Sequence, residues 1–138
     1  MKLAKLEQVF FVQNSHLVEV LHKEKRGYGI VVVSFAGGLT FGIPLRSHIK
    51  HSACFRTVGE AGLDYSKAVI ITDKSHIGGA FKIPPNEYVK IADREIFITQ
   101  RFEKYVGKYI IAVRKVDKNV LREYQYSTLQ NYHTELKI

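Results

Sequence analysis

The segment FGIPLRSHIKH, residues 41–51, gathers the side chains of this sequence that could do chemistry. It presents Arg46, Ser47, His48, Lys50 and His51 within six consecutive positions. Arg and Lys can stabilise phosphate charge, a Ser hydroxyl can bind a phosphate oxygen, and His can exchange a proton near neutral pH. Cleavage of RNA without a metal needs these groups, because the 2′-OH must lose a proton, the transition state carries extra charge, and the 5′ oxygen must gain a proton. The cluster alone leaves open a merely solvated basic loop.

The backbone of this segment decides which of its side chains can act together. In a helical turn, Ser47, Lys50 and His51 share one face at spacings of three and four. In an extended chain, Arg46, His48 and Lys50 lie on one side instead. We expect the turn, with the N–H groups near Ser47 exposed to a phosphate.

Basic residues elsewhere could complete such a site. Arg26, in KEKRGYG, precedes an expected strand, and Lys67, in GLDYSKAVII, opens another. Lys23 and Lys25 are candidates for contact with RNA, with helix-end charge as the alternative. For Lys67 the alternative is a strand-edge charge.

Aromatic side chains that could stack on bases are Tyr28, Tyr65 and Phe81, and each is equally suited to the core. A metal site is poorly supported, because His48 and His51 lack a nearby Cys or acidic pair to complete the ligands. Cys54 is interpreted as a buried small residue rather than a nucleophile. We expect no metal and no cofactor.

Composition sets the scaffold for these residues. The chain has 138 residues and a formal net charge of +8, with 46% hydrophobic residues, which is typical of one globular domain over residues 1–138. The positive charge favours a polyanionic partner. The single Cys54 excludes an internal disulfide and suits a reducing cytoplasm. We predict no signal peptide and no membrane-spanning segment.

The elements that must position the cluster follow from periodicity. We predict a strand at residues 7–12, a helix from Asn14 or Ser15 to Gly27, and a hairpin turning at Gly37 and Gly38. Its strand pairing should fail near Pro44. A strand at residues 67–72, a helix starting at residues 84–85, a helical pattern from residue 93 and a partly helical segment over residues 118–136 follow. An antiparallel sheet early and helices late predict an α+β fold.

The strings RGYGIVVVS, LTFGIPLRSHIKH, GLDYSKAVIIT and ITQRFEKYVGKYI together resemble the TenpN family of toxins from type III toxin–antitoxin systems, relatives of ToxN, CptN and AbiQ. The resemblance covers almost the whole chain and is weakest in the last twenty residues. It implies a compact, strongly twisted antiparallel sheet or partial barrel with flanking helices, similar to the Kid and MazF toxins.

The resemblance also implies an activity and partners. Members of this family are metal-independent, sequence-specific endoribonucleases that leave a 2′,3′-cyclic phosphate and a 5′-hydroxyl. They process a repeat-derived pseudoknot RNA antitoxin that inhibits them, and they cleave cellular RNA when it is lost, for instance during phage infection. We therefore expect a cytoplasmic toxin in an RNA-bridged complex, acting in antiviral defence.

Carried over by position, the family's Pro-Leu-x-Ser segment makes Ser47 the first choice for the active site. The basic residue shortly after it corresponds to Lys50, the one before the first hairpin strand to Arg26, and the one entering the later strand to Lys67. The sequence departs from the family pattern at Arg46, and by the addition of two histidines that are candidates for the acid and the base.

Two alternatives stay open. The first is a non-catalytic RNA-binding module, and the second is a Kid-like ribonuclease neutralised by an acidic protein. All three hypotheses require a positive face, so net charge does not separate them.

Overall fold

The computed structural model describes residues 2–21, 28–35 and 37–138. The elements in chain order are β1 (Lys2–Leu6), α1 (Gln8–Gln13), β2 (Tyr28–Phe35), β3 (Leu39–Arg46), β4 (Cys54–Arg56), β5 (Gly62–Asp64), the 3₁₀ turn η1 (Tyr65–Lys67), β6 (Val69–Ile70), the 3₁₀ turn η2 (Lys74–His76), β7 (Ile77–Ala80), α2 (Pro85–Asp93), α3 (Glu95–Lys115), α4 (Lys118–Glu123) and the 3₁₀ turn η3 (Thr128–Asn131).

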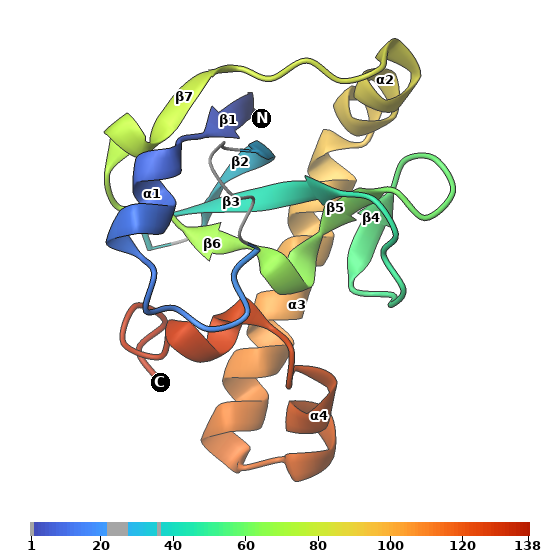
Figure 1. Cartoon of the computed structure of the whole chain (residues 1–138). Coiled ribbons are helices and arrows are strands. Elements are labelled where there is room, and N and C mark those ends of the chain that lie inside the picture. The colour runs from blue at the N-terminus through green and yellow to red at the C-terminus, as the bar shows by residue number, and fades with distance from the viewer. Residues whose placement is uncertain (1, 22–27, 36) are drawn as a thin grey trace.

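The strands form one antiparallel sheet in the order β4-β5-β3-β2-β1-β7, and β6 pairs with β3 beside this path (Figure 1). The α+β class predicted from the sequence is confirmed. The barrel-like architecture implied by the resemblance is not, because the described strands form an open sheet whose two ends, β4 and β7, do not pair with each other. In the described part of the chain, no helix is long and apolar enough to cross a membrane.

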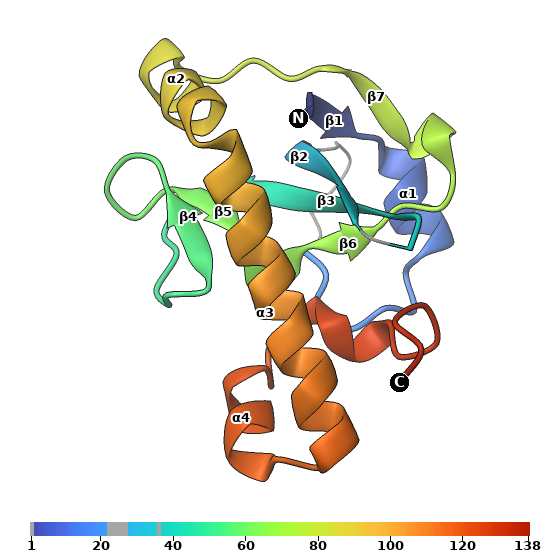
Figure 2. The same cartoon turned by 180° about the vertical axis from the view of Figure 1, so that it is seen from behind.

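Helix α3 runs across one face of the sheet (Figure 2). Its buried residues Ile98, Phe102, Val106 and Tyr109 recur at spacings of three and four, which places them on one face of the helix. Phe102 packs edge-on against Phe41 of β3, with ring centroids 5.0 Å apart. Deleting such a fully buried ring costs about 3–5 kcal/mol, so this contact fixes α3 on the sheet. The helical pattern predicted from residue 93 is confirmed.

The hairpin β2–β3 delivers the basic segment to its place. Gly37 and Gly38 have φ of 93° and 89°, as the predicted turn requires. Pairing with β2 ends where Ile30 faces Pro44, but β3 continues to Arg46 by pairing with β5. The predicted end of pairing near Pro44 is therefore correct for β2 but not for β5. The N–H donor that proline lacks affects only one edge of the strand.

The N-terminal prediction is wrong. The strand lies at Lys2–Leu6, and Gln8–Gln13 is a helix. The β-branched and aromatic content of residues 8–12 favours a strand, but only Phe10 of α1 is buried there, where it packs in one cluster with Leu6 of β1. Residues 15–21 form no helix, and the predicted helix end at Gly27 lies outside the described residues.

Candidate active site

The loop after β3, residues 47–53, is held in a non-helical conformation by its own contacts. The helical turn predicted for Ser47, Lys50 and His51 is therefore wrong. Ile49 is fully buried, and its N–H donates to Glu60 O at 2.9 Å. Arg56 donates to Ile49 O at 3.1 Å and to His51 O at 3.0 Å. His48 takes the left-handed φ of 58°. With Ile49 anchored inward, Ser47, His48 and Lys50 are exposed, and Ser47 and His51 line different hollows.

Asp64 is the centre of the polar cluster beside this loop. Its side chain is 0% exposed and accepts from Arg46 Nη1 at 2.9 Å. It also accepts from Ser66 Oγ at 2.6 Å and from Ser66 N at 3.0 Å, and so caps η1. A buried carboxylate requires such donors, because an unpaired buried charge is costly. Three elements, β3, β5 and η1, are thereby joined at one point.

His51 lies against the same carboxylate. Its Nε2 is 3.2 Å from Oδ1 and 3.3 Å from Oδ2 of Asp64, and 3.2 Å from Ser66 Oγ. Its Nδ1 accepts from Ala53 N at 3.1 Å, which assigns the proton of the neutral ring to Nε2. The side chain is 39% exposed, so a ligand can reach the ring. An imidazole held by a buried carboxylate in this way is positioned for proton transfer.

This ring opens onto a hollow of about 460 Å³, which we call the His51 cavity. Helix α3 contributes Arg101, Lys104 and Lys108 to its lining, at spacings of three and four. Lys108 pairs at 3.2 Å with Glu123, which also lines the cavity, so Arg101 and Lys104 are the cations available to a ligand. Tyr126, 64% exposed, also lines it. A cavity with cations on one wall and an aromatic side chain at its edge suits a single-stranded nucleic acid, whose phosphates pair with cations and whose bases stack.

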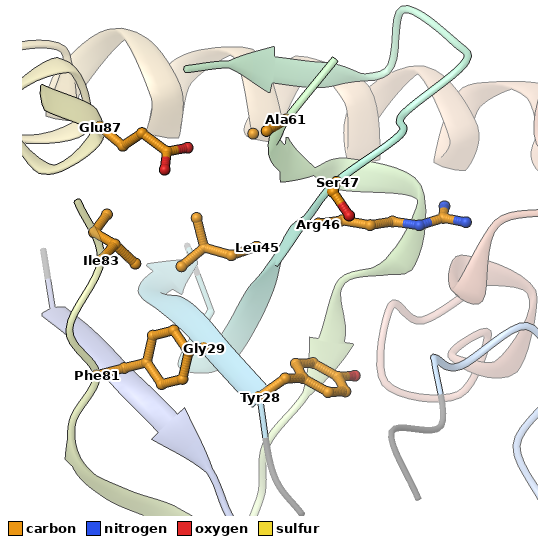
Figure 3. Close-up of a pocket in the computed structure, with 10 residues that line it drawn as sticks. Tyr28, Gly29, Leu45, Arg46, Ser47, Ala61, Phe81, Ile83 and Glu87 are labelled. Carbon is orange, nitrogen blue, oxygen red and sulfur yellow. The ribbon is translucent and has the colours of Figure 1, made fainter. Parts of the chain in front are cut away.

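A second hollow of about 440 Å³, which we call the Glu87 pocket, lies on the other side of the end of β3 (Figure 3). Ser47 and the stem of Arg46 line it, together with Phe81, Ile83 and Glu87. The Arg46 guanidinium points away from Phe81 and Ile83 in Figure 3 and pairs with Asp64. Arg46 and Ser47 therefore line the Glu87 pocket, and His51 lines the His51 cavity. Arg46 is linked to His51 only through Asp64, which both side chains contact.

Two other predicted catalytic residues are engaged in ion pairs. Lys50 Nζ is 2.8 Å from both carboxylate oxygens of Glu60, on an exposed surface. This ion pair lowers the pKa of Glu60, mainly through the hydrogen bond from Lys50. Lys67 is buried, and its Nζ donates to Glu19 and to Tyr126 O, each at 2.8 Å. It tethers the N-terminal segment and is not among the residues that line the His51 cavity.

The remaining candidates divide into core residues and residues outside the described chain. Tyr65 is 1% exposed and donates to Ile98 O at 3.1 Å, and burial raises its pKa to about 12, so it is a core residue and does not stack on bases. Tyr28 is buried, but it lines the Glu87 pocket. Arg26, Lys23 and Lys25 lie outside the described residues.

The structure also bears on the thiol and the metal-ligand alternatives. Burial raises the pKa of the Cys54 thiol above its ordinary value, which disfavours the reactive thiolate. Within residues 2–21, 28–35 and 37–138, no group of three or more His, Cys, Asp or Glu side chains is placed to hold a metal ion.

Sequence reasoning missed the partners that complete the cluster. Asp64 is not among the predicted site residues, although the D-x-S spacing of Asp64 and Ser66 is that of a capping turn. Arg101, Lys104 and Lys108 were visible only as the polar face of a helix, which is usually solvated. Nothing in the sequence places that face in the same cavity as His51.

Comparison with protein-family models, with curated proteins and with solved structures gives no match.

Proposed function

We propose that the chain is an endoribonuclease that cuts RNA by attack of the 2′-OH, without a metal ion. The observation that carries the proposal is the position of His51, oriented by the buried Asp64 at the mouth of a cavity that Arg101 and Lys104 also line. Metal-independent RNA cleavage needs a proton-transfer group next to cations that stabilise phosphate charge. This cavity offers both.

In the proposed reaction the bond from the 2′ oxygen to phosphorus forms as the bond to the 5′ oxygen breaks. The proton of the 2′-OH is removed and one proton is delivered to the 5′ oxygen, leaving a 2′,3′-cyclic phosphate and a 5′-OH. His51 is assigned to delivering its Nε2 proton to the 5′ oxygen, for which Nε2 must turn from Asp64 toward the bound RNA, and solvent water takes up the 2′-OH proton. Arg46, whose side chain is 33% exposed, and Arg101 are assigned to the phosphate charge.

The biological setting that we propose is a toxin of a type III toxin–antitoxin system, held inactive by a repeat-derived pseudoknot RNA and released during phage infection. Two observations support it: the resemblance of the LTFGIPLRSHIKH and GLDYSKAVIIT segments, and the net charge of +8, which favours an RNA partner. Tandem repeats of a few tens of bases followed by a terminator, directly upstream of the coding sequence, would support an RNA antitoxin. An acidic reading frame there would support a protein antitoxin instead.

The decisive experiment is cleavage of a labelled RNA in excess EDTA, with His51→Gln and Ser47→Ala compared at equal concentration. Gln keeps much of the size of His but cannot transfer the proton, so the rate should fall by at least about 100-fold. Ser47→Ala tests the position that the resemblance ranks first. Loss of cleavage in Ser47→Ala with an unchanged rate in His51→Gln would place the chemistry on the Glu87 side. A requirement for added divalent metal would overturn the mechanism.

One observation favours a second function, RNA binding without cleavage. Asp64, Arg46, His51 and Ser66 satisfy one another's hydrogen bonds, as a purely structural cluster also would. Under that hypothesis His51→Gln would leave RNA affinity unchanged, and the wild-type protein would release no cyclic phosphate. The same cleavage and binding assays therefore separate the two functions.

A further inference from the structure

The Glu87 pocket differs from the proposed catalytic cavity in its chemistry. Its lining includes a free carboxylate oxygen, from Glu87, beside the apolar side chains of Leu45 from β3 and of Phe81 and Ile83 from the segment between β7 and α2. Figure 3 shows these side chains around the hollow, with the Glu87 carboxylate facing them from α2. Its volume of about 440 Å³ is in the range of small-molecule sites. A few polar groups among apolar walls are the usual composition of a ligand pocket.

Phe81 is fixed against the backbone of β2. A Cβ atom built on Gly29 would lie 2.3 Å from Cδ1 and 2.6 Å from Cε1 of Phe81, so this ring occupies the space of a side chain at position 29. Only glycine permits so close an approach. The ring is thereby held as one wall of the pocket, where it can cover the face of a planar ligand.

The Glu87 carboxylate gives the pocket its specificity. Its Oε1 accepts from Thr57 Oγ1 at 2.6 Å, which fixes the orientation of the group. Its Oε2 has no hydrogen-bond partner among the described residues, and neither does the Tyr28 hydroxyl, although Tyr28 is only 6% exposed. An acceptor of this kind beside apolar walls favours a ligand that brings N–H donors.

We propose that the Glu87 pocket binds a guanine base of the RNA, an inference that rests on the proposed function. A carboxylate accepts best from two adjacent donors, because it offers two oxygens side by side. Guanine presents N1–H next to its N2 amino group. Adenine and cytosine each present one amino group next to a ring nitrogen that repels a carboxylate. Uracil presents one N–H between two carbonyl oxygens.

The pocket is joined to the proposed catalytic cavity through the end of β3. Arg46 lines the pocket with its stem and pairs with Asp64 through its guanidinium, and Asp64 holds His51. Ser47 stands at the same edge with an exposed hydroxyl. In this proposal the ribose and phosphate of a guanine bound to Glu87 lie on the Arg46 side of the pocket. The pocket sets which nucleotide is presented for cleavage.

The test is binding of the four 5′-mononucleotides GMP, AMP, CMP and UMP, measured by calorimetry or by NMR titration. The phosphate is common to all four, so differences report the base. We expect GMP to bind at least about tenfold more tightly than AMP. Glu87→Gln should remove this preference, because the amide presents only one acceptor oxygen, while that oxygen can still accept from Thr57. Phe81→Leu should weaken GMP and AMP alike. Asp93→Asn, exposed on the same helix, is the matched control and should change nothing.

The outcomes separate this inference from the proposed function. Equal binding of the four nucleotides, or an unchanged GMP preference in Glu87→Gln, would overturn the guanine site whatever the cleavage activity is. A GMP preference in a wild-type protein that does not cut RNA would leave the guanine site standing and refute the nuclease proposal. Thermal unfolding of each variant shows whether a loss of binding reflects a loss of fold.

Discussion

The two hollows on either side of the end of β3 are nearly equal in size, about 440 and 460 Å³, yet they differ in chemistry. The His51 cavity is lined by Arg101 and Lys104 and by a histidine held on a buried carboxylate, Asp64, that is enclosed by donors. The Glu87 pocket is itself lined by a carboxylate, and this carboxylate has an unused acceptor oxygen. In the first, the carboxylate organises other protein groups. In the second, it is available to a ligand. The role of each acidic side chain therefore depends on how deeply it is buried and on how many protein hydrogen-bond donors surround it.

The largest expected effect comes from replacing each of the two carboxylates, Asp64 and Glu87, by its amide. Asp64→Asn removes the charge that pairs with Arg46, and the new amide nitrogen cannot accept a hydrogen bond, so either Arg46 or Ser66 loses its acceptor. The free energy of unfolding should fall by roughly 3 kcal/mol in urea titrations, and RNA cleavage should be lost. Glu87→Gln should cost less than about 1 kcal/mol, because Thr57 keeps an acceptor. Equal losses of unfolding free energy in the two variants would contradict the different roles assigned to Asp64 and Glu87.

A second comparison tests Lys67, which the resemblance assigns to catalysis and the structure places in an ion pair with Glu19. Glu19→Gln breaks this pair without changing Lys67, and Lys67→Met removes the ammonium itself. Each variant should lower the free energy of unfolding by about 1–2 kcal/mol, because the Lys67 side chain is 11% exposed and Glu19 34%. If Lys67 is only a structural tether, both variants should keep the wild-type rate of RNA cleavage per folded molecule. A rate lost in Lys67→Met and kept in Glu19→Gln would return Lys67 to the active site.

A third prediction concerns the cationic wall of the His51 cavity. Arg101→Gln with Lys104→Gln should weaken binding of a non-cleavable single-stranded RNA by roughly 1 kcal/mol per residue. The slope of log K against log salt should become shallower by about 1.4, because each lost phosphate contact contributes about 0.7. Lys115→Gln, in the last turn of the same helix and outside the cavity, is the control. The GMP preference of the Glu87 pocket should survive in the double variant, which separates charge recognition from base recognition.

The parts of the fold with a strong local pattern could be predicted from the sequence. The hairpin was predictable because Gly37 and Gly38 permit positive φ, and α3 was predictable because its apolar residues recur at helical spacing. The N-terminal strand and helix were not, because Leu6 and Phe10 belong to different elements whose boundary carries no marker.

The candidate site was predictable by residue type more than by arrangement. The basic segment after β3 does line both hollows through Arg46, Ser47 and His51. Its division between them follows from the burial of Ile49, a tertiary effect that no local spacing reveals. The contact of His51 with Asp64 depends on the pairing of β4 with β5, which places Cys54 opposite Asp64 and so brings the neighbouring His51 close to Asp64.

The smallest expected effect concerns Lys50, whose pair with Glu60 lies outside both hollows and is exposed to solvent. Because Lys50 lowers the pKa of Glu60, the midpoint of Glu60 in a carbon-detected NMR titration should lie below that of an ordinary Glu, and Lys50→Met should raise it. A depressed pKa in the folded state contributes stability above the unfolded pKa, and this contribution is lost as pH falls through the folded pKa. The exposure of both side chains keeps it small.

The same titration decides where Lys50 belongs when RNA is bound. If Lys50 moves to a phosphate, as the resemblance implies, saturation with a non-cleavable RNA breaks the pair and raises the pKa of Glu60 toward its ordinary value. If the pair persists, the midpoint stays low, and the contacts with RNA lie within the two hollows. The RNA's own charge also raises the midpoint, so Asp73 serves as the reference, since its pKa is lowered mainly by its hydrogen bond with Ser75 rather than by a Lys. Only a rise at Glu60 well beyond that at Asp73 assigns Lys50 to the RNA.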